Sequence, residues 1–333
     1  MNILGIETSC DDTAAAIVRD GREIVSNIIS SQNEFHEKYG GIVPEIASRK
    51  HVELILYVIQ NALDTAGMTY EGIDVIAVTH RPGLVGSLLI GLSAAKSIAY
   101  CHGKPLVGVN HLSGHVYANF LNKPDLDLPH LSLTVSGGHT LVMYVTSPTQ
   151  YTVLGHTVDD AIGEAYDKVA KFLGLGFPGG PVIDRMAKEG NPNAVEFPSP
   201  LIYSKDLNFS FSGLKTAVIR YVTEQKHAER EINYADIVAS FQKAAIKVLI
   251  KKVLKAAQEK RVSTITLSGG VAANSALRET LIAEARQHGI RVCYPPLVLC
   301  TDNGAMIAGV AYHLYQAGVR SGFDLNAYPA IPY

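Results

Sequence analysis

The sequence has few cysteines, little net charge and no long apolar run free of charged residues, and each shortage excludes a class of protein. Its cysteines form no C-x-x-C pair: Cys10, Cys101, Cys293 and Cys300. Four cysteines in 333 residues make no disulfide framework, so a reducing, cytoplasmic location is expected. The most apolar stretch, residues 84–99, contains Lys96, serines and glycines, and therefore predicts a buried helix rather than a membrane span.

Two further absences narrow the functional classes. The net charge is −2, so any nucleic-acid contact would need a local patch or partner subunits. The sequence has no G-x-x-x-x-G-K-[ST] motif, which excludes a P-loop protein. Residues 174–179 match G-x-G-x-x-G, but they close a predicted helix instead of joining a strand to one, so no dinucleotide site is predicted. Residues 1–7 lack a basic start, and no signal peptide is expected.

What is present is an ordinary globular composition with an internal repeat. Hydrophobic residues make up 47% and charged residues 18%, and the length suits two lobes. A strand, a small polar turn and two more strands occur over residues 2–30 and again over residues 131–154. Helices follow each set. We interpret this as two copies of one fold unit.

Three segments show helical periodicity. The first is residues 44–66, with an expected inner face of Val52, Ile55, Leu56, Ile59 and Leu63. The second is residues 157–173, with an acidic flank and with an expected apolar side of Val158, Ile162, Ala165, Val169 and Phe172. The third is residues 234–260, where a separate face carries Lys243, Lys247, Lys251 and Lys255. A row of lysines on a helix is usually just a solvent-exposed face. Contact with a polyanion is the less favoured interpretation.

Two histidines lie four residues apart at His111 and His115. This spacing puts both rings on one face of a helix, a workable geometry for two metal ligands. Among 12 histidines, one such pair can also arise by chance. The pair alone leaves both interpretations open.

Small polar turns follow the predicted strands at residues 8–13, 136–140 and 268–274. Backbone N–H groups in such turns can bind phosphate. Ordinary Asx or Ser/Thr turns and tight helix–strand packing explain the same residues about as well.

The combination of motifs resembles one family closely. The matching segments are residues 5–11 (GIETSCD), 41–45 (GIVPE), 82–84 (PGL), 110–115 (NHLSGH), 135–140 (VSGGHT), 210–215 (SFSGLK), 268–274 (SGGVAAN) and 300–306 (CTDNGAM). They are similar to the signatures of the TsaD family, the tRNA threonylcarbamoyladenosine transferases, in order from residue 3 to about 310. The resemblance implies an α/β fold of the duplicated, two-lobed actin/Hsp70/sugar-kinase (ASKHA) type with a central cleft. It predicts an N-terminal lobe of residues 1–110, to which a C-terminal helix near 303–325 returns. It predicts a C-terminal lobe of residues 111–302.

The resemblance also implies site residues. One divalent metal per subunit, usually iron and in some preparations zinc, would be held by His111, His115 and Asp302. Contacts to an adenine nucleotide or to threonylcarbamoyl-AMP are implied for Thr134, Val135, Ser136, Gly137, Gly138, Asp167, Gly180, Asp184 and Asn274. Asp11 is the candidate general base, with Glu7 and Asp12 behind it.

The implied reaction moves the threonylcarbamoyl group from threonylcarbamoyl-AMP to the exocyclic amine of the adenosine 3′ to the anticodon, in tRNAs that read ANN codons. The implied partners are TsaB, TsaE and a TsaC-type synthase that supplies the adenylate, besides the tRNA itself. No membrane partner is expected. Two positions depart from the family pattern, since Asp12 stands where glutamate is common and Arg81 where glycine usually precedes Pro82.

The sequence disfavours three alternative functions. A zinc endopeptidase of the H-E-x-x-H type needs glutamate directly after the first histidine, and Leu112 occupies that position. A non-catalytic scaffold is disfavoured by an intact set of three metal ligands. A generic sugar kinase of the same fold would not need that set.

Overall fold

The computed structural model describes residues 1–123 and 125–330 and divides into two compact units. Unit 1 consists of residues 1–126, 147–150 and 295–333, and unit 2 of residues 127–146 and 151–294. Unit 1 includes the helix that begins at His111, which the predicted boundary at residue 110 assigned to the other lobe. Within the described ranges, no helix is both long enough and apolar enough to cross a bilayer.

Unit 1 is built on a five-stranded mixed sheet with the strand order β3-β2-β1-β4-β5. The strands are β1 (Asn2–Glu7), β2 (Asp12–Arg19), β3 (Glu23–Ser31), β4 (Val75–Arg81) and β5 (Leu106–Asn110). The first three form an antiparallel meander, and β4 and β5 extend the sheet in parallel from β1. The near-continuous apolar sequence of β1 and β4 fits strands that are buried on both faces.

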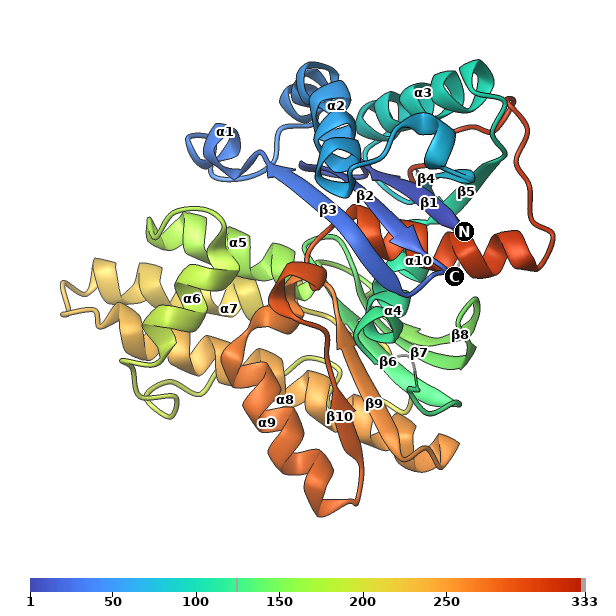
Figure 1. Cartoon of the computed structure of the whole chain (residues 1–333). Coiled ribbons are helices and arrows are strands. Elements are labelled where there is room, and N and C mark those ends of the chain that lie inside the picture. Colours follow the sequence, from blue (N-terminus) through green and yellow to red (C-terminus); the bar gives the residue numbers. More distant parts are fainter. Residues whose placement is uncertain (124, 331–333) are drawn as a thin grey trace. The chain divides into compact units, whose positions relative to one another are not determined.

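Helices cover both faces of this sheet (Figure 1). Helices α2 (Pro44–Ala66) and α3 (Val85–Cys101) pack on one face, against β2, β3 and β4. Helices α4 (His111–Asn122) and α10 (Gly304–Gln316) pack together on the other, where α10 lies against β1. A short helix, α1 (Asn33–Glu37), follows β3. The C-terminal part of the chain therefore completes the layer under the N-terminal strands.

Two glycines allow α10 to sit directly on β1. A Cβ added to Gly5 would lie 2.4 Å from the carbonyl oxygen of Gly304 and 2.6 Å from the backbone nitrogen of Ala308. A Cβ on Gly304 would lie 2.5 Å from the backbone nitrogen of Ala16. Since these obstacles are backbone atoms, no side-chain rotation can relieve them. The close approach fixes the start of α10 against the sheet.

This contact gives a stability prediction. Gly5→Ala is expected to lower the free energy of unfolding by about 3 kcal/mol, because the added methyl forces α10 away from β1. Gly72→Ala is the matched control in the same unit, since its nearest neighbour would be the flexible Met68 side chain at 3.9 Å. Urea unfolding of both variants measures the difference. Equal midpoints for the two variants would contradict the prediction.

Unit 2 repeats the sheet of unit 1. Its strands are β6 (His130–Val135), β7 (Thr140–Ser147), β8 (Gln150–His156), β9 (Thr264–Ser268) and β10 (Arg291–Cys293). Their order, β10-β9-β6-β7-β8, is that of unit 1 read from the opposite edge, with β6 antiparallel to β7 and parallel to β9. The predicted duplication and the α/β fold class are therefore confirmed.

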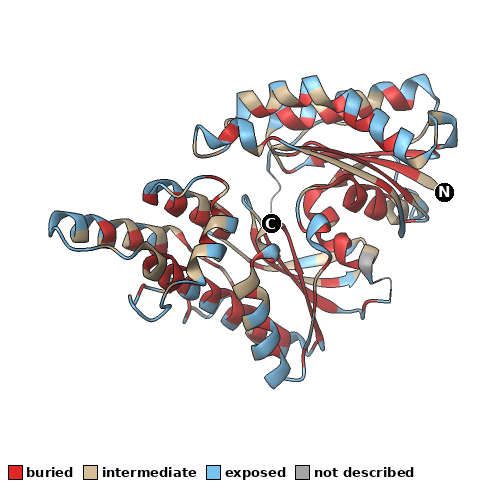
Figure 2. Cartoon of the chain, turned by 60° about the vertical axis from the view of Figure 1, so that its left-hand side comes forward, coloured by how far each residue is buried: buried red, intermediate tan, exposed pale blue. Residues whose placement is uncertain are grey.

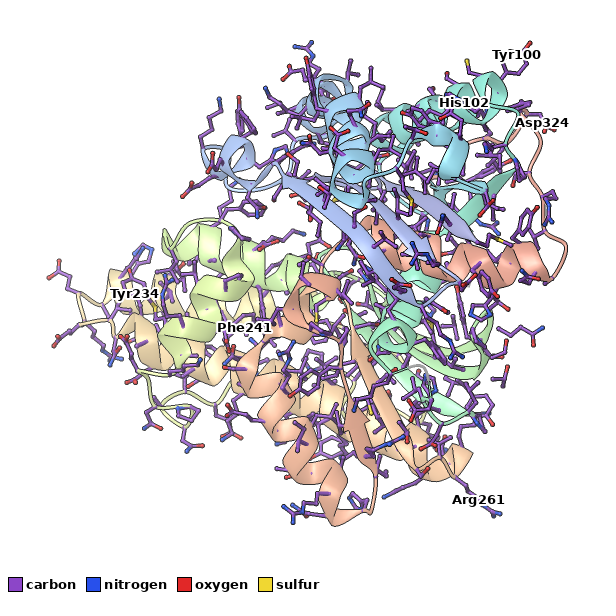
Figure 3. All side chains as sticks on the ribbon, in the orientation of Figure 1. Tyr100, His102, Tyr234, Phe241, Arg261 and Asp324 are labelled. Carbon is purple, nitrogen blue, oxygen red and sulfur yellow. The ribbon has the colours of Figure 1, made fainter. Side chains whose placement is uncertain are left out.

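The helices of unit 2 surround the longest one, α8 (Tyr234–Lys260). They are α5 (Ile162–Leu173), α6 (Gly179–Ala187), α7 (Ser212–His227) and α9 (Ser275–Gln287). Phe241 of α8, labelled in Figure 3, is fully buried. Its ring centroid lies 5.4 Å from that of Tyr166. The buried Lys252 donates to Ser204 Oγ at 2.8 Å and so holds the loop before α7 onto this helix.

Two predictions about helical faces were wrong in part. Val52 and Leu56 of α2 are 61% and 66% exposed, because the sheet covers a narrower stripe that includes Ile55 and Ile59. Figure 2 shows by colour that helices of the chain carry both buried and exposed residues. The helix predicted from residue 157 begins at Ile162. Thr157 instead forms a bridge to Phe209, and its hydroxyl donates to the carbonyl of Asp160, so this segment stays non-helical. Val158 is consequently 56% exposed.

Candidate functional site

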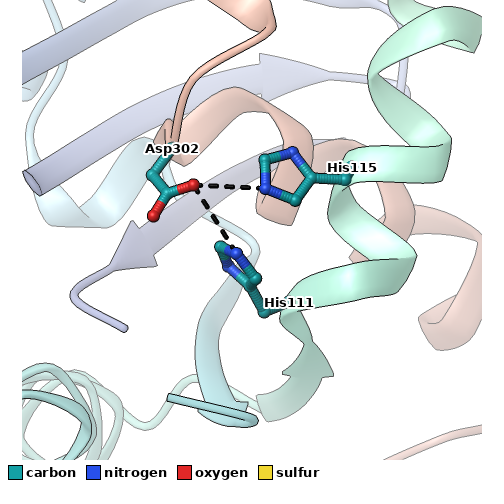
Figure 4. Close-up of side chains that lie close together, drawn as sticks. All are labelled: His111, His115 and Asp302. Atoms are coloured by element: carbon teal, nitrogen blue, oxygen red, sulfur yellow. Dashed lines mark ion pairs between the residues drawn. The ribbon is translucent and has the colours of Figure 1, made fainter. Parts of the chain in front are cut away.

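Two histidines from α4 and one aspartate from the turn before α10 meet in unit 1 (Figure 4). Helix α4 starts where β5 ends, and the Asn110 side chain caps it by accepting from Leu112 N at 2.8 Å. One turn separates the two histidines, so both rings project from the same face. Asn303 caps α10 through Met306 N at 2.9 Å, which fixes Asp302 just before that helix.

The three side chains have the geometry of a metal site. Oδ1 of Asp302 lies 3.2 Å from Nε2 of His115 and 3.5 Å from Nε2 of His111. The three ligand atoms lie within 4.8 Å of one another. Nitrogen and oxygen ligands bind zinc at about 2.0–2.2 Å, so a cation placed centrally could reach all three after small adjustments.

His115 supplies an independent test of that fit. It is fully buried, and among the described residues neither of its ring nitrogens has a hydrogen-bond partner. Its Nε2 lies 3.2 Å from Oδ1 of Asp302 as an ion-pair contact and does not form a hydrogen bond. A buried polar atom without a hydrogen-bond partner destabilises the folded state. A cation between the rings and the carboxylate would satisfy it, so the residues present fit a divalent metal.

The charges of the group alter its proton affinities. Burial lowers the pKa of His111, but the carboxylates of Asp302 and Glu7 outweigh burial and raise that pKa to about 9. Burial and the nearby charge of His111 lower the pKa of His115. A metal ion would replace the proton that His111 otherwise retains, because the same lone pair binds either.

The turn between β1 and β2 brings the predicted acidic residues to the same group. Burial, reinforced by the charge of Asp302, raises the pKa of Asp11. The same two causes, followed by the charge of Asp11, raise the pKa of Asp12 to about 8. Both aspartates are only partly buried, whereas Glu7 is fully buried. Asp11 and Asp12 are thus both partly exposed to solvent and both have a raised pKa.

Glu7, which was predicted to lie behind the candidate base Asp11, is surrounded by hydrogen-bond donors. Its Oε1 accepts from Ser9 N at 2.5 Å, and its Oε2 accepts from Thr79 Oγ1 at 2.6 Å. Oε2 also lies 2.9 Å from Nδ1 of His111. Ser9 Oγ lies 3.1 Å from the same nitrogen. Sequence reasoning missed Ser9 and Thr79, because nothing in a strand residue such as Thr79 marks it as a neighbour of Glu7.

The remaining predicted residues lie in unit 2. Strands β6 and β9 are parallel neighbours, so the loops after them, 136–138 and 269–270, leave the same edge of the sheet. Gly269 has a φ of +85°, and a Cβ there would lie 2.3 Å from the carbonyl oxygen of Val135. In the described part of the chain, and apart from the two chain neighbours of each glycine, no atom lies within 4 Å of a Cβ added at Gly137, Gly138 or Gly270. These glycines leave room for another group close to the backbone.

Several side chains of unit 2 that were predicted to contact the ligand form hydrogen bonds within the chain. Asp167 Oδ1 accepts from Gly179 N at 2.7 Å, at the start of α6, next to Gly180. Asp184 accepts from Ser275 Oγ at 2.9 Å and from Ser275 N at 3.2 Å. Thr134 Oγ1 lies 2.8 Å from Ser268 Oγ and is buried beside Val135. Ser136 Oγ accepts from His139 N at 3.1 Å, which closes the loop after β6.

Asn274 is also engaged on both sides. Its Oδ1 accepts from Leu277 N at 2.8 Å and caps α9, while its Nδ2 donates to Gln242 Oε1 at 2.8 Å. Gln242 lies on α8 and was not singled out from the sequence. Asp184 and Asn274 therefore shape the N-terminal turn of α9 from two directions, and their contact with a ligand stays a prediction.

Comparison with known proteins decides the family. The family described as TsaD, tRNA N6-adenosine threonylcarbamoyltransferase, matches residues 23–309. The chain belongs to this family. Proteins of that name from Clostridium botulinum (strain 657 / Type Ba4) and Clostridium perfringens (strain SM101 / Type A) are 54% and 53% identical to it. The first alignment covers 99% of this chain and 97% of the relative, and the second covers 98% and 96%.

Membership in the TsaD family makes the chain a transferase of tRNA modification, and the predicted family and enzyme class are confirmed. Solved structures with distant sequences share its fold. Component A of the (R)-2-hydroxyglutaryl-CoA dehydratase of Acidaminococcus fermentans has a TM-score of 0.58 at 17% identity and covers 95% of this chain and 98% of its own. A full-length HypF structure has a TM-score of 0.64 at 14% identity, covering 95% and 46%. Both likenesses support the ASKHA-type fold alone.

Proposed function

We propose that this TsaD family member transfers the threonylcarbamoyl group of threonylcarbamoyl-AMP to the exocyclic amine of the adenosine 3′ to the anticodon, in tRNAs that read ANN codons. It would act in the cytoplasm with TsaB, TsaE and a TsaC-type synthase. The observation that carries the proposal is the convergence of His111, His115 and Asp302, in a chain whose relatives are tRNA N6-adenosine threonylcarbamoyltransferases.

The target amine is a poor nucleophile, because its lone pair is delocalised into the ring of the base. A divalent metal, iron or zinc, held by His111, His115 and Asp302 would supply Lewis-acid polarisation of acyl or phosphate oxygens. As the amine nitrogen forms its bond to the carbonyl carbon, the bond from that carbon to the phosphate oxygen would break and AMP would leave, while Asp11 would accept the proton of the amine. Its partial burial and raised pKa support this role, because a carboxylate with increased proton affinity is a better base.

Unit 2 would hold the nucleotide. Backbone N–H groups of Ser136, Gly137, Gly138 and the 269–270 loop suit the phosphate, because these loops leave open space at the strand ends. Asp167, near Gly180, and Asp184 suit the ribose hydroxyls, and Asn274 suits a base or sugar edge. Since Asp184 and Asn274 are bonded within the chain, a ligand would share or replace those bonds.

Reconstitution tests the proposal. Wild-type chain with TsaB, TsaE, a TsaC-type synthase, unmodified tRNA, threonine, bicarbonate and ATP is expected to produce threonylcarbamoyladenosine, detected by nucleoside mass spectrometry. His111→Ala in the same mixture is expected to produce none above background. Modified nucleoside at wild-type yield from His111→Ala would refute the metal-assisted reaction.

An exposed apolar stripe on α2 is our candidate for the TsaB contact. Val52, Leu56 and Tyr57 are 61%, 66% and 72% exposed, with Val52 and Leu56 one turn apart on the same side of the helix and Tyr57 next to Leu56 in sequence. Apolar residues gathered on a helix face and left uncovered mark interaction surfaces. We infer that a helix or sheet of TsaB covers this stripe.

Leu56→Asp is expected to weaken the TsaB complex at least about tenfold, because it places a charge at the centre of an apolar contact. Isothermal titration with purified TsaB measures the affinity. Val158→Asp is the matched control, since Val158 is 56% exposed but belongs to unit 2. Unchanged affinity for Leu56→Asp, or an equal loss for Val158→Asp, would place the contact elsewhere.

A further inference from the structure

Glu7 is the most constrained acid of the group around the metal ligands. It is fully buried, and each of its carboxylate oxygens faces at least one donor. Ser9 N and Thr79 Oγ1 donate to it, and Nδ1 of His111 lies 2.9 Å from its Oε2. A general base must reach the proton that it removes. A buried carboxylate whose oxygens are directed at protein donors has no such access.

The same contacts determine the proton position on His111. A carboxylate only accepts hydrogen bonds, so Nδ1 of His111 must carry the proton that faces Glu7. The opposite nitrogen, Nε2, is the one that faces Asp302. In a neutral imidazole with hydrogen on Nδ1, the lone pair is on Nε2. Ser9 Oγ, 3.1 Å from Nδ1, can donate or accept and so selects neither tautomer.

We propose that Glu7 is a positioning residue, which holds the His111 ring in the tautomer and orientation that present Nε2 to the metal. This rests on the metal site of the proposed function. Carboxylates that orient metal-bound histidines in this way are widespread, and their loss typically costs about 10–100-fold in metal affinity. The proposal separates Glu7 from Asp11 and Asp12, since it assigns Glu7 no proton transfer with the substrate.

Register explains why Glu7 is held so firmly. Strands β1 and β4 are parallel neighbours with Ile6 opposite Val78, so Glu7 and Thr79 follow at the same level of the sheet. The hydrogen bond from Thr79 fixes one oxygen, and the backbone of Ser9 fixes the other. The carboxylate is thus fixed by the sheet, and its contact with Nδ1 fixes the orientation of the His111 ring at the start of α4.

The decisive variant is Glu7→Gln, which keeps size and shape. Its single amide oxygen can accept from Ser9 N or from His111 but not from both, because the NH₂ group is a donor. In the metal-free variant the ring can shift its proton to Nε2, and metal binding must then reverse that shift. A related exchange of carboxylate for amide beside a catalytic histidine traps the wrong tautomer.

The test measures zinc affinity of the full chain by competition with a chromophoric chelator. Glu7→Gln is expected to bind Zn²⁺ about 10–100-fold more weakly than wild type. Thr79→Val removes a hydrogen bond to the same buried carboxylate but leaves the acceptor for His111, and it is expected to stay within about threefold. Unchanged affinity in Glu7→Gln, or an equal loss in Thr79→Val, overturns the proposal.

A second measurement needs no variant. In zinc-loaded wild-type protein with ¹⁵N-labelled histidine, NMR is expected to show His111 protonated at Nδ1 and coordinated through Nε2. Coordination through Nδ1, or a wild-type chain that binds no zinc, overturns the proposal. Neither measurement involves tRNA. If both give the expected result while reconstitution yields no modified nucleoside, the role of Glu7 stands and the proposed reaction fails.

Discussion

Asp302→Ala is expected to abolish metal binding and to reduce tRNA modification at least about 100-fold. The carboxylate would supply the oxygen ligand beside the two imidazoles, and its Oδ1 is the atom that faces Nε2 of both His111 and His115. Removing a direct ligand should cost more than the 10–100-fold typical of groups that only orient one. Metal content by mass spectrometry of the purified chain and nucleoside analysis of reconstituted tRNA measure the two effects.

The control for this prediction is another histidine of unit 1. His102 follows α3 on the surface, where its ring stacks on Tyr70 at 4.5 Å, and Figure 3 labels it. His102→Gln is expected to retain full metal content and full modification. Should Asp302→Ala keep both its metal and its activity, the group at α4 and α10 would not be the metal centre.

Asp11→Asn is expected to lower the rate of transfer by about 10²–10⁴-fold while nucleotide binding stays within about twofold of wild type. The amide has nearly the same shape but cannot accept the amine proton. The expected loss therefore appears in the rate of the chemical step and not in affinity. Single-turnover transfer and equilibrium binding of ATP, measured on the same preparations, separate the two effects.

Asp12→Asn distinguishes between the neighbouring acids. Burial, aided by the charges of Asp302 and Asp11, raises the pKa of Asp12 to about 8, so near neutral pH it is largely protonated and a weaker candidate acceptor. We expect a smaller loss of transfer from Asp12→Asn than from Asp11→Asn. The reverse order would move the base to Asp12, and wild-type turnover by Asp11→Asn would end the assignment of that residue.

The sequence was sufficient for the architecture because its signals are local. The repeated strand–turn–strand–strand pattern predicted both sheets, and the spacing of His111 and His115 put them on one helix face. The metal group also needed Asp302, which is distant along the chain, and only the family resemblance pointed to it. Periodicity could not decide which apolar residues of α2 the sheet covers, so Val52 and Leu56 were misplaced.

Contacts made through strand register were beyond sequence reasoning. Thr79 reaches Glu7 because β1 and β4 pair in parallel with one particular alignment, and a shift of that alignment would move both side chains. Gln242 reaches Asn274 because α8 lies beneath the start of α9. Neither residue belongs to a motif. Both depend on how elements far apart in the chain are brought together.

The seating of α10 on β1 through Gly5 and Gly304 has a consequence for biosynthesis. The strands and histidines of unit 1 emerge from the ribosome long before Asp302, and the whole of unit 2 is translated in between. A nascent chain therefore presents two imidazoles without their carboxylate until α10 has docked. The three side chains that would hold a divalent metal are all present only near the end of translation or afterwards, so a metal would be bound by the finished polypeptide.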